Sequence, residues 1–491
     1  MTITGENFDT EMGNKPDLVG EMRLKNIHKG EDGNEEFDED GKPRRTGTVW
    51  TASAHIITAI IGSGVLSLAW CVAQLGWIAG PLALFTFSFI TFYTSTLLAD
   101  CYRSPDPVNG KRNYTYMEAV KANLGGAKYM ICGVTQYINL VGISIGLTVT
   151  ASISMVAIQK SICYHKEGHE ASCAVSNNPP MISFGIFEIV LSQIPNIHKL
   201  SWLSTVAAIM SFSYTLIGVA LSLQRIISGN TGNTSLGGIE VGPDVSEVQK
   251  VWRSFSALGD IAFAYSFSLI LIEVQDTLRS PPAENREMKK ATMIGVTTTT
   301  LFYVMCGCVG YAAFGSNAPG NLLTGFGFYK PFWLIDFANV CIVVHIVGAY
   351  QVFSQTVFAA FEAWVIKKWQ TSKFITREYV MNIAGKRFKI NCFRLVWRSI
   401  FVMFTTVLAM AMPFFNDVLA LLGAMGYWPL TVYFPIEMYI AQKKMKRFTF
   451  RWVALELLNF GCLVVAVAAA CGSIQGLTKA LQVYKPFTSK Q

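Results

Sequence analysis

Residues 55–70 read HIITAIIGSGVLSLAW, an apolar run with a histidine at its start and Gly62-Ser63-Gly64 at its centre. The run is apolar enough to cross a membrane, yet glycine and serine are poor helix formers. Non-helical backbone at membrane depth persists only where it lines a cavity or is buried in protein. If the helix opens here, the run predicts a binding site inside a membrane protein. The simpler alternative is a small-residue crossing between two helices.

The composition places this run in a polytopic membrane protein. The chain has 491 residues, of which 52% are hydrophobic and only 15% are charged, and its mean hydropathy is +0.37. Soluble chains carry about 25% charged residues. Apolar runs near the length of one helical membrane crossing recur along the chain, without the alternation typical of β-barrel strands. We therefore expect an all-α polytopic membrane protein.

The apolar runs predict eleven membrane spans. They cover approximately residues 48–77, 79–102, 127–158, 181–195, 200–224, 254–277, 291–314, 331–365, 393–413, 416–440 and 449–473.

Basic residues predict how these spans are oriented. If the spans alternate, 31 of the 40 lysines and arginines fall on the side of the N-terminus. Cytosolic loops hold the excess of basic residues, so the N-terminus is expected in the cytosol and the C-terminus outside. The resulting layout is a disordered acidic cytosolic tail (1–47), five spans (48–224), an extracellular loop (225–253), five spans (254–440), an eleventh span (449–473) and an extracellular tail (474–491).

This orientation decides the smaller motifs in the loops. Cys163 and Cys173 are the only cysteines expected in an external loop, where they are candidates for a disulfide or free thiols. Their loop, CYHKEGHEASC, has a cysteine and histidine order that matches no common zinc module, so we expect no metal. Asn233 begins an external glycosylation motif, whereas the motif at Asn113 is expected to face the cytosol and stay unmodified.

The sixth span favours the binding-site interpretation over simple packing. It reads FSALGDIAFAYSFSLILIEVQD and has Ala264-Tyr265-Ser266 near its middle. Interrupted segments at matching places in two halves of a chain are a pointer to a transporter site. Free amides at such a break can hold an anion and free carbonyls can hold a cation. A zwitterionic amino acid carries both charges.

Several polar residues lie inside the predicted spans, where they are costly unless they pair or face water. His55, Asp260 and His345 are candidates for a proton path, with neutral packing as the alternative for each histidine. Asn139 is a candidate pocket residue, with helix packing as its alternative. Three acidic residues at the ends of spans are expected to cap or to pair with lysines, and one in the short fourth span has no assigned role; these are Glu118, Asp276, Glu437 and Glu188, respectively.

The sequence shows no sign of an enzyme. It contains no nucleophile elbow, phosphate-binding loop, paired catalytic carboxylates or metal-binding spacing. It also has no basic patch interleaved with surface aromatic residues, so no nucleic-acid partner is expected. The longest cytosolic loop is too short for a nucleotide-binding domain. Any transport must therefore draw on an ion gradient, and no cofactor is expected.

Long stretches of the chain resemble the plant amino acid permeases of the amino acid/auxin permease family, in the amino acid-polyamine-organocation superfamily. The stretches include GTVWTASAHIITAIIGSGVLSLAWCVAQLGWIAGP, YRSPDPVNGKRNYTYMEAV, GDIAFAYSFSLILIEVQDT, LTGFGFYKPFWLIDFANVCIVVHIVGAYQVF and PFFNDVLALLGAMGYWPLTVYFPIEMYIAQKK, and the resemblance covers about residues 42–487. It implies a proton-coupled importer of neutral and acidic amino acids in the plasma membrane. It also implies a leucine-transporter-like fold of two inverted five-helix repeats plus an eleventh helix.

The same resemblance implies roles for individual residues. The breaks of the family's first and sixth helices fall on Ile61, Gly62, Ser63 and Gly64 and on Ala264, Tyr265 and Ser266, and the family's two histidines fall on His55 and His345. One departure is that relatives usually carry Gln-Pro where this chain has Gln355-Thr356. Without that proline the eighth helix is expected to be less kinked.

These observations give a hypothesis for the binding site. Amides of Ser63 to Val65 hold the substrate carboxylate, and carbonyls near Ile61 and Ala264–Ser266 hold the ammonium. Tyr265 and Phe267 shape the side-chain pocket and gate. The expected partners are amino acids, protons and the lipid bilayer, with the proton as coupling ion. The alternatives are an auxin-type carboxylate importer, a channel, a non-transporting nutrient receptor and, more distantly, a membrane enzyme that uses His345.

Overall fold

The computed structural model describes residues 38, 44–168, 171–194, 201–243, 245–327, 332–383, 386–411 and 415–483. The chain divides into two units, Met1–Thr46 and Gly47–Gln491. Most of the predicted acidic tail, and residues 484–491 of the predicted C-terminal tail, lie outside the described residues. In the first unit the Arg45 guanidinium pairs with the Asp38 carboxylate at 2.6 Å.

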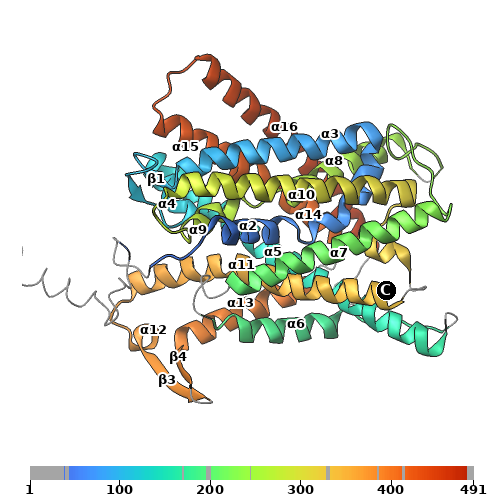
Figure 1. The fold of residues 1–491 in the computed structure, drawn as a ribbon, viewed down its shortest axis with the longest axis horizontal. Helices are drawn as coiled ribbons and strands as arrows, with labels where there is room; N and C mark the ends of the chain where they lie inside the picture. The colour runs from blue at the N-terminus through green and yellow to red at the C-terminus, as the bar shows by residue number, and fades with distance from the viewer. Residues whose placement is uncertain are drawn as a thin grey trace, which may run out of the picture. The chain divides into compact units, whose positions relative to one another are not determined.

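The second unit is a bundle of helices (Figure 1). Its helices are α2 (Val49–Ile60), α3 (Gly64–Asp100), α4 (Tyr116–Asn123), α5 (Gly126–Glu167), α6 (Asn178–Leu191), α7 (Ser201–Ile227), α8 (Glu247–Ala264), α9 (Leu271–Gln275), α10 (Glu284–Phe314), α11 (Phe332–Lys368), α12 (Lys373–Thr376), α13 (Cys392–Ala411), α14 (Phe415–Gly426), α15 (Phe434–Gln442) and α16 (Phe450–Val483). Short 3-10 helices are η2 (Ser268–Ile270), η3 (Gly315–Asn317) and η4 (Leu322–Phe326), and η5 (Tyr427–Tyr433) is a π-helix.

Nine helical segments in the described ranges are long and apolar enough to cross a membrane, and α2 and α6 are shorter apolar helices. Helix α3 covers the C-terminal part of the first predicted span and all but the last residues of the second. The two parts meet at Gly76, which has φ 80°. A Cβ at this position would also collide with the backbone of residues 236–238. Only glycine fits this kink, since the conformation is left-handed and the loop of residues 236–238 approaches it closely.

The expectation of an all-α chain was incomplete. Strands β1 (Arg103–Ser104) and β2 (Lys111–Arg112) form one antiparallel hairpin, and β3 (Glu378–Ile383) and β4 (Lys386–Asn391) form another. In the first hairpin loop the Asp106 carboxylate accepts hydrogen bonds from the amides of Val108 and Asn109 at 2.9 and 2.7 Å. These bonds lower the pKa of Asp106 below its usual range, because they favour the charged form.

Helices from the two halves of the chain pack against one another. Helix α10 packs along α3 and α2, whereas α11 packs on α5 and α7, and α13 on α5 and α6. In Figure 1, α2 lies between α10 and α11 in the middle of the bundle. Helices α8 and α14 touch through glycines, since a Cβ on Gly259 would lie 2.6 Å from the carbonyl oxygen of Ala420. This packing brings the interrupted segments of both halves together.

Candidate substrate site

Two helices of the bundle are interrupted where the sequence predicted. Helix α2 ends at Ile60, and Ile61 leaves the helical region with ψ 72° before α3 begins at Gly64. Helix α8 ends at Ala264, and residues 265–267 are not helical before η2 and α9 continue the segment. The alternative interpretation, a small-residue crossing alone, therefore does not account for the first span, because its backbone opens.

The two interruptions touch each other. A Cβ on Gly64 would lie 3.0 Å from both the Cα and the Cβ of Ala264. A Cβ on Gly62 would meet only Nε2 of His345, at 3.7 Å, which is ordinary contact. Gly64 is therefore required by the close approach of the sixth-span break, whereas Gly62 has space around it.

A small cavity lies at this meeting point. The space open to the centre of a water molecule is only about 20 Å³, which is enough to hold about one water. An amino acid does not fit until the walls move apart. The residues that line the cavity are Thr58, Ala59, Ile60, Gly62, Ser63, Gly64, Ile143, Leu147, Phe263, Ser266, Ala349 and Phe353.

The start of α3 presents hydrogen-bond donors beside this cavity. The first amides of an α-helix have no partner within the helix, and Ser63 makes no side-chain cap for them. The Ser63 hydroxyl is buried, and its oxygen has no hydrogen-bond partner among the described residues. The positive end of the helix dipole and an unpaired hydroxyl together suit a carboxylate.

The carbonyls on the other side of the break already have donors, which the sequence hypothesis did not include. The oxygen of Ile61 accepts hydrogen bonds from Ser211 Oγ at 3.0 Å and from the Tyr214 hydroxyl at 3.2 Å. The Tyr214 hydroxyl also lies 3.1 Å from the oxygen of Gly62. The Tyr303 hydroxyl contacts the oxygens of Ile60 and, at 2.9 Å, of Ala264.

His345 lies directly behind the first break. Its Nδ1 is 2.7 Å from Ser211 Oγ and 3.1 Å from the oxygen of Ala207. If Nδ1 carries the proton, it donates to Ser211, which in turn donates to Ile61. Nε2 then faces Gly62 as an acceptor, and it has no partner among the described residues. His345 therefore reaches the break through one serine.

The other two proton-path candidates lie elsewhere. His55 is buried on α2, seven residues before Gly62 in the chain. Asp260 is buried on α8, and its Oδ2 lies 3.8 Å from the Cys71 thiol. The cavity lining includes neither residue. The structure thus groups His345 with the break but does not gather the three candidates into one cluster.

Several residues of the sequence hypothesis do not line the cavity. Tyr265 points toward α10, where its hydroxyl donates to Thr300 Oγ1 at 3.2 Å, and Phe267 is buried in the core. Asn139 donates to the carbonyl of Thr135 at 3.1 Å, and its side chain packs against Gly426. Helix packing, the alternative interpretation of Asn139, therefore describes this position better than a role in the pocket. Ile61, Val65 and Ala264 are also buried in the core, outside the cavity lining.

Conversely, the cavity includes apolar residues that the sequence hypothesis missed. Ile143 and Leu147 come from α5, Ala349 and Phe353 from α11, and Phe263 from α8. Each pair on α5 and α11 has a spacing of four, which places both members on one helix face. That spacing is the only signal for them in the sequence, and lipid-facing residues share it.

The chain matches a known protein family over most of its length. The family model described as "Transmembrane amino acid transporter protein" matches residues 45–479. The chain belongs to this family. Members of the family and the similar relatives are amino acid permeases, which are transporters rather than enzymes. The family and the apolar helices together identify a multi-pass membrane protein that functions in amino acid transport.

The similarity to individual relatives extends over nearly the whole chain. Amino acid permease 6 of Arabidopsis thaliana is 61% identical over 459 residues, which are 93% of this chain and 95% of that protein. Amino acid permease 1 of the same plant is 60% identical over 452 residues, covering 92% and 93%. The crystal structure of MhsT in complex with L-phenylalanine has a TM-score of 0.54 at 10% identity, covering 88% of this chain and 99% of that one. This likeness shows a shared fold.

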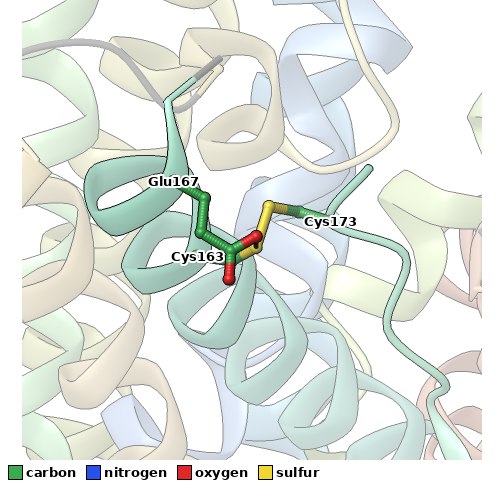
Figure 2. Close-up of a disulfide and its surroundings, with 3 residues drawn as sticks. All are labelled: Cys163, Glu167 and Cys173. Carbon is green, nitrogen blue, oxygen red and sulfur yellow. Dashed lines mark hydrogen bonds between the residues drawn. A yellow bond between two sulfur atoms is a disulfide. The ribbon is translucent and has the colours of Figure 1, made fainter. Parts of the chain in front are cut away.

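The structure places the candidate residues for a disulfide and for glycosylation. Cys163, near the end of α5, is bonded to Cys173 across ten residues (Figure 2), and the Glu167 carboxylate lies 3.9 Å from the Cys163 sulfur. Asn233 is exposed. Asn113 is buried and donates to the carbonyl of Cys101 at 3.2 Å, so its side chain is not available for modification.

Of the three acidic residues at the ends of spans, Glu437 pairs with a lysine and Glu118 caps a helix start as expected, whereas Asp276 binds a tyrosine instead. Glu437 pairs with Lys128 at 2.5 Å, Asp276 accepts from the Tyr102 hydroxyl at 2.7 Å, and Glu118 accepts from the amide of Tyr114 at 2.8 Å. The unassigned residue Glu188 is buried and accepts from Gln351 on α11 at 2.6 Å. Helix α11 continues without interruption through Gln355-Thr356.

Proposed function

We propose that this transporter imports neutral and acidic amino acids together with protons across the plasma membrane, by alternating access. The observation that carries the proposal is the contact between the two helix breaks around a cavity with an unpaired Ser63 hydroxyl. Such a site offers donors to a carboxylate and acceptors to an ammonium without any charged side chain.

The substrate carboxylate binds at the start of α3 in this proposal. The amides of Ser63, Gly64 and Val65 and the Ser63 hydroxyl provide the donors. The ammonium binds to carbonyls of Ile61 and Ala264–Ser266. The Ala264 oxygen accepts from the Tyr303 hydroxyl and has a second lone pair for the ammonium. The Ile61 oxygen already accepts from both Ser211 and Tyr214, so it binds the ammonium only when one of these hydroxyls turns to its other acceptor, the oxygen of Ala207 or of Gly62. Ser266 lines the cavity, so the ammonium is expected on that side.

The cavity walls support the neutral part of the proposed substrate range. Among the described residues that line the cavity, none is acidic or basic. Neutral side chains therefore fit this cavity without a charge penalty. The ionised side chain of an acidic or a basic amino acid meets no counter-charge from the lining, which is costly. Phe263 and Phe353 bound the space for neutral side chains.

Proton coupling is supported by the position of His345. This residue connects to the Ile61 carbonyl through Ser211, so a change in its protonation alters the hydrogen bonds of the break. His55 and Asp260 are retained as further members of the path. Gain of a proton at one of these sites would change the free energy of one conformation relative to another, as coupling requires.

The helix arrangement supports two inverted five-helix repeats followed by an eleventh helix. The breaks occur in the first and sixth spans, and α3 packs on α10 as α5 packs on α11. The small volume of the cavity supports alternating access, because its walls must move apart before an amino acid fits. The excess of basic residues supports a cytosolic N-terminus and an extracellular C-terminus.

Transport by the full-length chain in proteoliposomes tests this function. With an acidic exterior, labelled alanine and glutamate should accumulate above the external concentration, and a protonophore should abolish the accumulation. A competition panel should show that free amino acids displace alanine and that auxin does not. Saturable binding without accumulation would indicate a receptor, and equilibration without accumulation would indicate a channel.

A further inference from the structure

One side chain contacts both interrupted helices at equivalent positions. Tyr303 on α10 directs its hydroxyl at the carbonyl oxygens of Ile60 and Ala264. Ile60 is the last residue of α2, and Ala264 is the last residue of α8. The two acceptors are therefore the carbonyl ends of the two half-helices that precede the breaks.

The Ala264 carbonyl needs a donor from outside its helix, whereas the Ile60 carbonyl accepts from the Gly62 amide at 2.7 Å and has a second lone pair for Tyr303. The last carbonyls of a helix have no partner within it, and they carry the negative end of the helix dipole. An unpaired carbonyl in the low-dielectric interior of a membrane protein is costly. The Tyr303 hydroxyl has one proton and offers it to two acceptors. It therefore attracts both half-helix ends toward one point.

The position of this hydroxyl is fixed by its surroundings. Tyr303 is completely buried, and its ring packs edge-to-face on the ring of Tyr265 at 5.1 Å. The Tyr265 hydroxyl donates to Thr300, one turn away on the same helix as Tyr303. Tyr303 does not line the cavity. It can affect a substrate only through the backbone that it holds.

The hydroxyl groups that α7 directs at the site contact only the first break. Ser211 and Tyr214 on α7 donate to Ile61 and Gly62. Within the described part of the chain, Tyr303 is the one side chain with hydrogen bonds to carbonyls at both breaks. The Gly64–Ala264 contact, by comparison, is steric and gives no attraction beyond packing.

We propose that Tyr303 is a positioning residue that holds the two half-helix ends at a fixed separation and so sets the affinity for the substrate. The inference rests on the proposed function of the cavity. Because carboxylate donors lie on one break and ammonium acceptors on both, a change in their separation misplaces one charge when the other is bound. Loss of the hydroxyl should therefore weaken binding more than it slows the transport cycle.

Tyr303→Phe removes this hydroxyl and keeps the ring. The apparent KM for alanine should rise about tenfold, with the maximal rate within about twofold of wild type at equal surface amount. Amide hydrogen exchange of the full chain in lipid nanodiscs gives a second measurement, which does not depend on transport. Exchange should accelerate in both segments, residues 58–66 and 262–269.

Tyr311→Phe is the matched control. Tyr311 is also buried on α10, and its hydroxyl donates to the backbone oxygen of Ser235 at 3.1 Å, away from both breaks. This variant should leave KM and the exchange of both segments unchanged.

The inference is overturned if Tyr303→Phe accelerates exchange at neither or only one break, or if its KM equals that of a transporting wild type. If the wild type fails to take up amino acids while both breaks still loosen in Tyr303→Phe, the proposed function fails, but the role of Tyr303 in holding the two half-helix ends stands.

Discussion

The two glycines of the first break differ in what surrounds them. Gly64 lies against the backbone of Ala264, so a methyl group there must push the two breaks apart. Overpacking of this kind costs about 1–3 kcal/mol. Gly62 has space for a methyl group, with His345 Nε2 at 3.7 Å as its nearest neighbour. The sequence motif alone gives both glycines the same importance.

Gly64→Ala should lower amino acid uptake about tenfold or more, whereas Gly62→Ala should change it by less than about threefold. Uptake is measured in cells that lack their own amino acid permeases and is normalised to the amount of protein at the surface. Equal losses in the two variants would contradict the steric argument. Normal uptake by Gly64→Ala would contradict the placement of the substrate site.

His345 provides the second prediction at this scale. Its bond to Ser211 couples its protonation to the Ile61 carbonyl. In the wild type, uptake at low substrate concentration should fall as the external pH rises. In His345→Ala this dependence should become flat, while Ser211→Ala should weaken it. A wild-type pH profile in His345→Ala would assign that histidine a packing role alone.

At the scale of helices and strands, the sequence predicted regular features well. Apolar runs predicted helix in every expected span, because a membrane-crossing backbone must satisfy its own hydrogen bonds. The sequence did not reveal the π-helix η5 or the β3–β4 hairpin. These depend on tertiary packing and on loop pairing, for which hydropathy carries no signal. The cavity-lining residues Ile143 and Phe353 were missed for the same reason.

A buried ion pair holds α13 to α11. Arg398 is 1% exposed, and its Nε donates to the Glu362 carboxylate at 2.6 Å. Its Nη1 donates to the carbonyls of Ser192 and Ile194 at 2.6 and 2.9 Å, just beyond α6. One side chain thus connects three helical segments. Removing one partner of such a pair leaves a buried charge without compensation.

Arg398→Ala should destabilise the protein by about 3–5 kcal/mol. The melting temperature of the purified protein in detergent measures the effect. The double substitution Arg398→Leu with Glu362→Leu should recover part of the loss, because no charge remains unpaired. Arg394→Ala is a suitable control, since Arg394 also contacts Glu362 but is partly exposed. An unchanged melting temperature in Arg398→Ala would contradict a structural role.

At the scale of the whole molecule, the arrangement predicts how transport responds to voltage. The cavity offers no charged side chain to cancel substrate charge. A zwitterionic amino acid carried with one proton therefore moves one positive charge inward per cycle. Each 100 mV of membrane potential contributes about 2.3 kcal/mol to that step. This corresponds to an accumulation ratio of about 50.

Alanine should therefore evoke an inward current in voltage-clamped cells, and its uptake should rise as the interior becomes more negative. Glutamate carries one extra negative charge near neutral pH. With the same single proton, its cycle moves no net charge, so glutamate uptake should be insensitive to voltage and should produce no current. Cells without the protein provide the baseline. A current of equal size with both substrates would require an additional proton for glutamate. Electrically silent alanine uptake would exclude one-to-one coupling to protons, because no other charge in the cycle balances the proton.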